Sequence, residues 1–518
     1  MAEKTSLLKA AWLIAFVTII SKFAGFIRDI VIANYYGAGL ASDAYFYAYQ
    51  IPSLAIILMG GVGGPFHSAA VSVFAKIVNP DDKTPPEKAQ KLFNTFVTAS
   101  FILFSLLAVI VFIFSEQIMS FIIHSSNQEL IYHASRHLRI MTPIIIIGGI
   151  IGIYYGLLIT YRCFLLPNIS PAVLSICIIV LLLASGGDDF GAYLAIGTVI
   201  GAALQFLLQV PAVRKLGYRI KPNLNIKNNP EFKNLIELVF PAALSSTIGQ
   251  IYVYVDMFFA SSLGSGSWTS IGYANRVFQF PAGILASAFL VPLFPIFSRL
   301  AGEKKYDEMK YYFHKGIGLL NFAAIPVVFL IIMLASDAVQ IVFQRGKFDN
   351  NAVSMVSQAL VFLAPAIIPY VFRDSVTRIF YSFNDSKTPF IIACSSIILK
   401  FILNALFINK LGIAAITLST TLVTLVNGSL LGILIKKKIN LGYKRYFTNL
   451  FKMLAAALCA YFIVIFLYNA WEYNSWLMHV FKAFSILVIY LALYTFLAVL
   501  FKTEYTKELL ERIKICRK

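Results

Sequence analysis

Charged side chains inside apolar segments are the residues of this sequence best suited to chemistry. The first apolar segment, about residues 6–34, contains Lys22, Arg28 and Asp29. Lys22 and Asp29 are seven residues apart and share one helical stripe, whereas Arg28 lies about 100° away. Gly25 between them allows a bend that turns all three toward one cavity. Because a charge at bilayer depth costs at least a few kcal/mol, each is a candidate functional residue.

Further candidates stand at the start of the second apolar segment and in the eighth. Asp43 opens the second segment, and Arg276 is followed one turn later by Gln279. For Arg28 the competing interpretation is that it snorkels to the headgroups. Two interpretations explain Asp43 equally well: it caps or pairs at the entry of a helix, or it binds a ligand. Lys22 and Arg276 are harder to explain in these ways and favour a lined cavity.

The chemistry of such a cavity follows from its charges. Guanidinium forks match phosphate oxygens, and a low dielectric strengthens the contact, so converging Lys and Arg favour a phosphate or pyrophosphate ligand. A cation exporter would need unmatched carboxylates, but Asp29 and Asp43 are matched by Lys22 and Arg28. We therefore expect an anionic head group.

A second site is weaker. Asp256, in the seventh segment, has no Lys or Arg in its own span, and Asn404 and Thr424 could bring neutral oxygens toward it. An acid with such oxygens can hold a monovalent cation or a proton. Ile408, one turn after Asn404, offers no oxygen, and a hydrogen-bonded cluster between helices explains the same residues.

The elements that must position these residues are transmembrane helices. The 518-residue chain is 59% hydrophobic and 15% aromatic, with 13% charged residues and a mean hydropathy of +0.79. Its apolar blocks are long enough to cross a hydrocarbon layer of roughly 30 Å and lack the alternation of a barrel. The fold class predicted is all-α and polytopic, with about fourteen spans. We expect these near 6–34, 43–75, 92–115, 138–160, 168–186, 190–213, 235–262, 271–298, 314–335, 355–380, 389–408, 411–435, 447–470 and 479–501.

Lys and Arg are biased to alternate connections between these segments. The net charge is +19, and Lys and Arg gather in 214–233, 299–310, 436–445 and the tail, whereas 36–42 and 263–270 hold no Lys or Arg. This bias orients membrane proteins, so we expect both termini in the cytoplasm and do not expect a nucleic-acid partner.

The two halves also contain a repeat. Arg28–Pro52 resembles Val255–Pro281, with Asp29 over Asp256 and a glycine eight residues after each acid. Repeated halves with interrupted helices at matching positions are typical of secondary transporters. We expect an N-terminal lobe over 1–214, a cytoplasmic connection over 215–234, a C-terminal lobe over 235–438, two extra helices over 439–502 and a basic tail over 503–518.

Other chemistries have no signature in the sequence. No G-x-x-x-x-G-K-[ST] loop, metal-ligand spacing or nucleophile–base set is found, and the five cysteines are scattered. The longest expected outer loops, 116–137 and 336–354, lack the acidic cluster that a glycosyltransferase would need. We expect no enzyme, no cofactor and no metal site.

Three stretches resemble the MurJ/MviN family of lipid II flippases, within the multidrug/oligosaccharidyl-lipid/polysaccharide exporter superfamily. They are Ser21–Pro52, Tyr273–Leu285 and Tyr381–Phe390, and the third also resembles Tyr161–Pro171. The resemblance covers nearly the whole chain. It implies fourteen helices, two six-helix lobes, a central cationic cavity and a groove for the polyprenyl tail at helices 13–14. The apolar residues of these two spans fit such a groove, and we expect its surface to include Phe462, Phe466, Phe484, Tyr490 and Phe496.

Residue by residue, the resemblance places Arg28, Asp29, Asp43 and Arg276 in the family's cavity. Lys22 stands where arginine is usual, Gln279 where an acid is common, and Ile56 where the family has a further arginine. A family acid falls within the run Gly60–Gly64 (these departures are typical of a divergent, cyanobacterial-like branch).

The function expected is therefore a secondary flippase. It would move a polyprenyl-pyrophosphate-linked peptidoglycan precursor, lipid II, across the bacterial inner membrane by alternating access. Lys22, Arg28 and Arg276 would bind the pyrophosphate, and Asp29, Asp43 and Gln279 would orient the charges. A monovalent cation or the membrane potential would drive transport. The expected partners are membrane lipids and cell-wall synthesis proteins. The protein is expected to be a monomer. Alternatives from the same superfamily are a polysaccharide-lipid exporter and a multidrug/cation antiporter.

Overall fold

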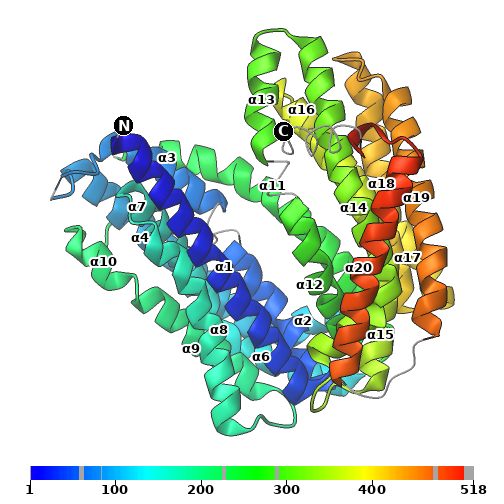
Figure 1. Ribbon diagram of the computed structural model, residues 1–518. Helices are drawn as coiled ribbons and strands as arrows, with labels where there is room; N and C mark the ends of the chain where they lie inside the picture. The colour runs from blue at the N-terminus through cyan, green and yellow to red at the C-terminus, as the bar shows by residue number, and fades with distance from the viewer. Residues whose placement is uncertain are drawn as a thin grey trace. The chain divides into compact units, whose positions relative to one another are not determined.

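The structure, a computed structural model, describes residues 2–57, 64–82, 84–125, 127–224, 229–285, 291–470 and 476–506. Every regular element within these ranges is a helix, which confirms the predicted all-α class (Figure 1). The chain divides into two compact units. Unit 1 comprises Met1–Thr269 with Arg345–Phe348, and unit 2 comprises Ser270–Gln344 with Asp349–Lys518.

The helices of unit 1 form the first half of the chain. They are α1 (Ala2–Tyr36), α2 (Leu40–Ala55), α3 (Pro65–Ile77), α4 (Glu87–Ile113), α5 (Ser115–Ile122), α6 (Gln128–Met141), α7 (Pro143–Thr160), α8 (Leu165–Ser185), α9 (Ala192–Leu207), α10 (Val210–Lys215) and α11 (Pro230–Ser261). The boundary between the units falls inside α12 (Ser267–Leu285).

The helices of unit 2 follow α12. They are α13 (Val291–Gly302), α14 (Tyr306–Phe343), α15 (Asn350–Leu363), the 3-10 turn η3 (Ala364–Ala366), α16 (Ile367–Ser382), α17 (Lys387–Leu411), α18 (Ile413–Leu434), the 3-10 turn η4 (Ile435–Lys437), α19 (Tyr443–Asn469) and α20 (Trp476–Leu500).

Eleven helical segments of the described residues are long and apolar enough to cross a membrane. They correspond to eleven of the expected spans. The other three expected spans are the first, the second and the eighth, and part of the second and part of the eighth lie outside the described residues. The total of fourteen spans stays a prediction.

Interruptions within spans have local causes. The second expected span is two helices, α2 and α3, and α3 begins at Pro65, where a missing N–H costs nothing. The expected break in the glycine-rich run falls on residues 58–63, outside the described residues. The fourth span is preceded by α6, and a new helix begins at Pro143 for the same reason.

The internal repeat is visible in how two matching helices end. After α7, Arg162 adopts φ 59°, and Cys163 N donates to Leu158 O at 2.8 Å. After α16, Asn384 adopts φ 58°, and Asp385 N donates to Phe380 O at 3.0 Å. Both are left-handed helix ends of the Schellman type. The two resembling stretches, Tyr161–Pro171 and Tyr381–Phe390, therefore share a backbone conformation as well as residues.

Each unit has its own apolar core. In unit 1 one cluster joins α3, α4 and α7 through Phe74, Phe93 and Leu157, and it includes Leu235 of α11. The span 235–262 was expected in the C-terminal lobe, but α11 packs on α3 and α4 and belongs to unit 1. The apolar pattern of α11 identifies a helix without saying which neighbours it packs against.

Candidate functional site

The first helix presents two cations in different environments. Lys22 is exposed, whereas the Arg28 guanidinium is paired with the Asp29 carboxylate, Nη2 lying 2.9 Å and Nε 3.1 Å from Oδ1. The Asp29 side chain is 5% exposed and that of Arg28 20%. Asp29 therefore holds the Arg28 side chain in one orientation by two charge-assisted bonds.

Asp43 has a different set of partners from those the sequence analysis gave it. Its carboxylate accepts hydrogen bonds from Gly266 N at 2.6 Å, Thr269 N at 2.8 Å and Thr269 Oγ1 at 2.6 Å. These groups lie at the start of α12, where backbone N–H groups have no partner within the helix. Asp43 is a cap, as one interpretation held, but for α12 and not for its own helix, which begins after Gly39.

Two predicted residues of the eighth span lie on α12 within unit 2. The half-buried Arg276 places its guanidinium carbon 5.7 Å from the ring centroid of Tyr273. Gln279 is exposed. Asp43 thus caps the first turn of the helix that carries Arg276.

The residues of the predicted ion site are distributed over both units. Asp256, on α11, is half-buried in unit 1, and Asn404 and Thr424 belong to unit 2. Asn404 is fully buried in α17, and Thr424 Oγ1 donates to Thr420 O at 2.7 Å.

Lys400, which the sequence analysis missed, lies one turn before Asn404 on α17. It is 3% exposed, and its Nζ donates to Thr420 Oγ1 at 2.7 Å. A buried ammonium group in the middle of a span therefore bonds Thr420, the threonine one turn before Thr424. The signal was present in the sequence, since an ionisable residue within a span is the criterion that selected Lys22 and Arg28.

Other ionisable residues within spans were also missed. On α16, Arg378 Nη2 lies 3.3 Å from Asp374 Oδ2, and the guanidinium of Arg373 lies over Tyr370 at 4.7 Å. Asp337 lies in the expected outer loop 336–354, but α14 continues through it, and there the buried Asp337 contacts α19 and α20.

Outside the spans, the connection between α8 and α9 is organised by a carboxylate. Asp188 accepts hydrogen bonds from Ala192 N at 2.8 Å, Tyr193 N at 3.1 Å and the Tyr36 hydroxyl at 2.8 Å. Partial burial by itself would raise the pKa of Asp188, but these donors stabilise the charged form and hold the pKa below its usual value.

The two extra helices pack against α14 and present an apolar surface. Phe462, Phe466, Phe484 and Phe496 are exposed, as a lipid-facing surface requires. Tyr490, which was expected on the same surface, is fully buried, and its hydroxyl donates to Ala457 O at 3.3 Å. Hydropathy alone could not separate the two faces, because both are apolar.

Apolar helices in two units, with charged side chains placed inside the spans, define an integral membrane transporter. A family model described as "Lipid II flippase MurJ" matches residues 32–501. The chain belongs to this family, whose members are transporters of the bacterial inner membrane.

Individual relatives that cover most of this chain bear the same family name. A "Probable lipid II flippase MurJ" of Synechocystis sp. is 32% identical and covers 81% of this chain and 80% of its own length. The "Lipid II flippase MurJ" of Burkholderia cenocepacia is 26% identical over 86% of this chain and 87% of its own.

Solved structures show the same fold. "Lipid II flippase MurJ, inward closed conformation" superposes with a TM-score of 0.79 at 21% identity, covering 96% of this chain and 99% of that one. A multidrug resistance transporter of the MOP superfamily in an inward-facing conformation gives 0.65 at 14% identity, covering 83% and 98%.

Proposed function

We propose that the protein is a secondary flippase for lipid II and carries this polyprenyl-pyrophosphate-linked peptidoglycan precursor from the inner to the outer leaflet by alternating access. The observation that carries the proposal is the family match over residues 32–501. The antiporter alternative is less favoured, because the buried acid of α1, Asp29, is paired with Arg28.

In this proposal Lys22, Arg28 and Arg276 bind the pyrophosphate. Lys22 is exposed, and Arg28 is held by Asp29 and is therefore pre-oriented. The contacts of Asp43 with Gly266 and Thr269 give it a positioning role toward α12, and Gln279 completes the polar set.

Orientation and coupling are further parts of the proposal. The Lys/Arg bias supports both termini in the cytoplasm. As a test, a single cysteine at Lys221 and a single cysteine at Gly266 should be labelled from opposite sides of the membrane. Asp256, Asn404 and Thr424 remain the proposed cation site. Membrane potential is the alternative source of coupling, and Asp256→Asn should abolish any sodium or proton dependence.

The proposed surroundings follow from the cargo. The exposed apolar residues of α19 and α20 support a groove for the polyprenyl tail, since each buried CH₂ is worth about 0.8 kcal/mol. Membrane lipids border the same surface, and cell-wall synthesis proteins are proposed partners of a monomeric flippase.

Complementation of a strain depleted of its own lipid II flippase tests the function. The wild-type chain should restore growth, and Arg28→Ala should fail while the protein stays in the membrane, because a phosphate partner is lost. Arg28→Lys should be less tolerated than Lys22→Arg. The first substitution removes a bidentate guanidinium fork, whereas the second introduces one. Arg299→Ala is the matched control. The Arg299 side chain is 64% exposed, and the substitution removes only a weak ion pair, in which Arg299 Nε lies 3.9 Å from Glu303 Oε1. Full activity of Arg28→Ala would favour snorkelling, and failure of the wild-type chain would contradict the proposed cargo.

A further inference from the structure

One end of α14 carries a buried carboxylate on which three helices meet. Asp337 is 3% exposed. The Tyr468 hydroxyl of α19 donates to its Oδ2 at 2.6 Å, and His479 Nδ1 of α20 lies 3.0 Å from its Oδ1. Each carboxylate oxygen therefore has a partner from a different helix of the extra pair.

A cation completes the cluster. Lys482, one turn after His479 on α20, places its Nζ 3.7 Å from the ring centroid of Tyr468, a cation–π contact. When His479 is neutral, the charges of Asp337 and Lys482 balance. The described contacts of α14, α19 and α20 bring four titratable groups together here, Asp337, Tyr468, His479 and Lys482.

His479 is the member that can change this balance. Histidine is the side chain whose charge changes between about pH 5 and 8. The bond from a neutral imidazole N–H to the Asp337 carboxylate is already charge-assisted on the acceptor side. A proton on the ring adds a positive charge to the donor and turns this hydrogen bond into an ion pair. Lys482 opposes the added charge, but it engages the Tyr468 ring, whereas His479 touches the carboxylate itself.

We propose that Asp337, Tyr468 and His479 form a proton-binding site, and that the bound proton fastens this end of α19 and α20 to α14. The fastening is stronger at low pH and weakens as the pH rises and the histidine becomes neutral. The proposal concerns the attachment of the extra helices and stands independently of the cargo.

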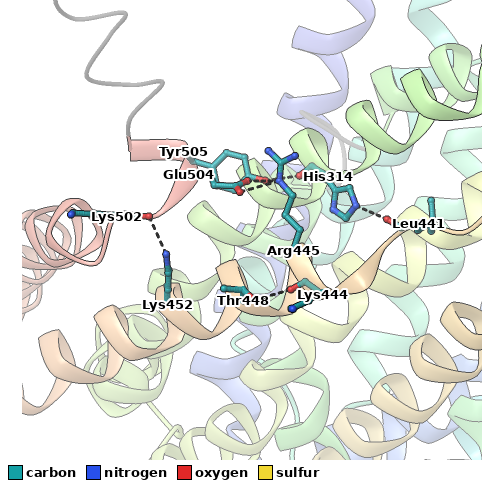
Figure 2. A network of polar contacts seen from close by, with 9 residues as sticks. All are labelled: His314, Leu441, Lys444, Arg445, Thr448, Lys452, Lys502, Glu504 and Tyr505. Atoms are coloured by element: carbon teal, nitrogen blue, oxygen red, sulfur yellow. Dashed lines mark hydrogen bonds and ion pairs between the residues drawn. The ribbon is translucent and has the colours of Figure 1, made fainter.

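The opposite end of the helix pair is held by separate contacts, shown in Figure 2. Arg445 Nε lies 2.9 Å and 3.0 Å from the two Glu504 carboxylate oxygens, and the Tyr505 hydroxyl donates to His314 O at 2.6 Å. The ring of His314 contacts Leu441 O at 2.5 Å. His314 and Asp337 are 23 residues apart on α14, or about 35 Å at 1.5 Å per residue. One end can therefore loosen while the other stays fixed.

Hydrogen exchange of the full-length protein in nanodiscs tests the site. The amides of residues 478–486 are followed by mass spectrometry at pH 6 and pH 8 and divided by their intrinsic exchange rates. In the wild-type protein the corrected exchange should be on the order of fivefold slower at pH 6, as expected when the hydrogen bond becomes an ion pair. His479→Gln, which keeps an N–H donor without titrating in this range, should abolish the difference, and so should Asp337→Asn.

Two variants separate the proton site from general packing. Tyr468→Phe should speed exchange at both pH values and keep the ratio, because it removes a hydrogen bond without removing the titrating group. His314→Gln, at the far end of α14, should leave the ratio for 478–486 unchanged. A wild-type ratio of one, or an unchanged ratio in a folded His479→Gln protein, would overturn the proposal. If His479→Gln does not fold, the Asp337→Asn ratio decides.

Discussion

Replacement of Asp43 should weaken the fold before it affects any ligand. The residue is 2% exposed and accepts three hydrogen bonds at the start of α12. Asp43→Ala leaves two buried backbone N–H groups, of Gly266 and Thr269, without their acceptor. Each costs about 1–3 kcal/mol, so the loss should be about 2–6 kcal/mol. Asp43→Asn keeps one acceptor oxygen and loses charge assistance, which should cost about 1.5–3 kcal/mol.

The measurement is the fraction of purified protein that stays monodisperse after heating, for each variant and for the double mutant with Thr269→Val. Thr269→Val removes only the hydroxyl bond and should cost about 1 kcal/mol. In Asp43→Ala the same change should cost nearly nothing, because the partner is already missing. Wild-type heat resistance of Asp43→Ala, combined with lost complementation, would refute the capping role and make Asp43 a ligand.

Three other perturbations test close contacts and one carboxylate. Gly37→Ala should destabilise unit 1 by roughly 2–4 kcal/mol, because Gly37 has φ +60° and an added Cβ would lie 2.4 Å from Lys347 O; unchanged thermal unfolding would contradict this. Asp188→Asn should reduce the loss of stability on acidification below about pH 4, since the wild-type carboxylate contributes above its usual pKa and stops contributing as the pH falls through its lowered value; equal acid sensitivity of both proteins would exclude the role. An added Cβ on Gly318 would clash with the Tyr505 ring. Gly318→Ala should therefore displace the Tyr505 side chain from α14 and speed proteolysis of the chain around Tyr505. Adding Tyr505→Ala should then cause little further change, and additive effects would argue against this contact.

Much of the helical framework could be predicted from the sequence, because hydrophobic length is a local property. The two resembling stretches correctly marked related helix ends. The partners of individual side chains could not be predicted in the same way. Asp43 bonds residues 223 and 226 positions away, and no local pattern contains that pairing.

The misassignments have a common physical cause. In a bilayer the outside of the protein is as apolar as its core, so an apolar face does not reveal whether it meets lipid or another helix. For this reason Tyr490 was expected at the surface although it is buried. Lys400 was passed over although it lies inside an expected span, whereas Asp337 was passed over because α14 continues beyond 335, where its span was expected to end. Every ionisable residue in a span therefore needs a partner assigned to it.

The residues Arg345–Phe348 belong to unit 1 although the chain passes through α12, α13 and α14 before reaching them. Lys347 N donates to Asn34 O at 2.9 Å, and this contact joins the segment to the end of α1. During synthesis, residues 270–348 must be added after the main part of unit 1 has left the ribosome. At about 5–20 residues per second this takes on the order of 4–16 s. Unit 1 therefore waits several seconds as a nascent intermediate with one surface unfilled, and a chaperone or insertase has that interval in which to act on it.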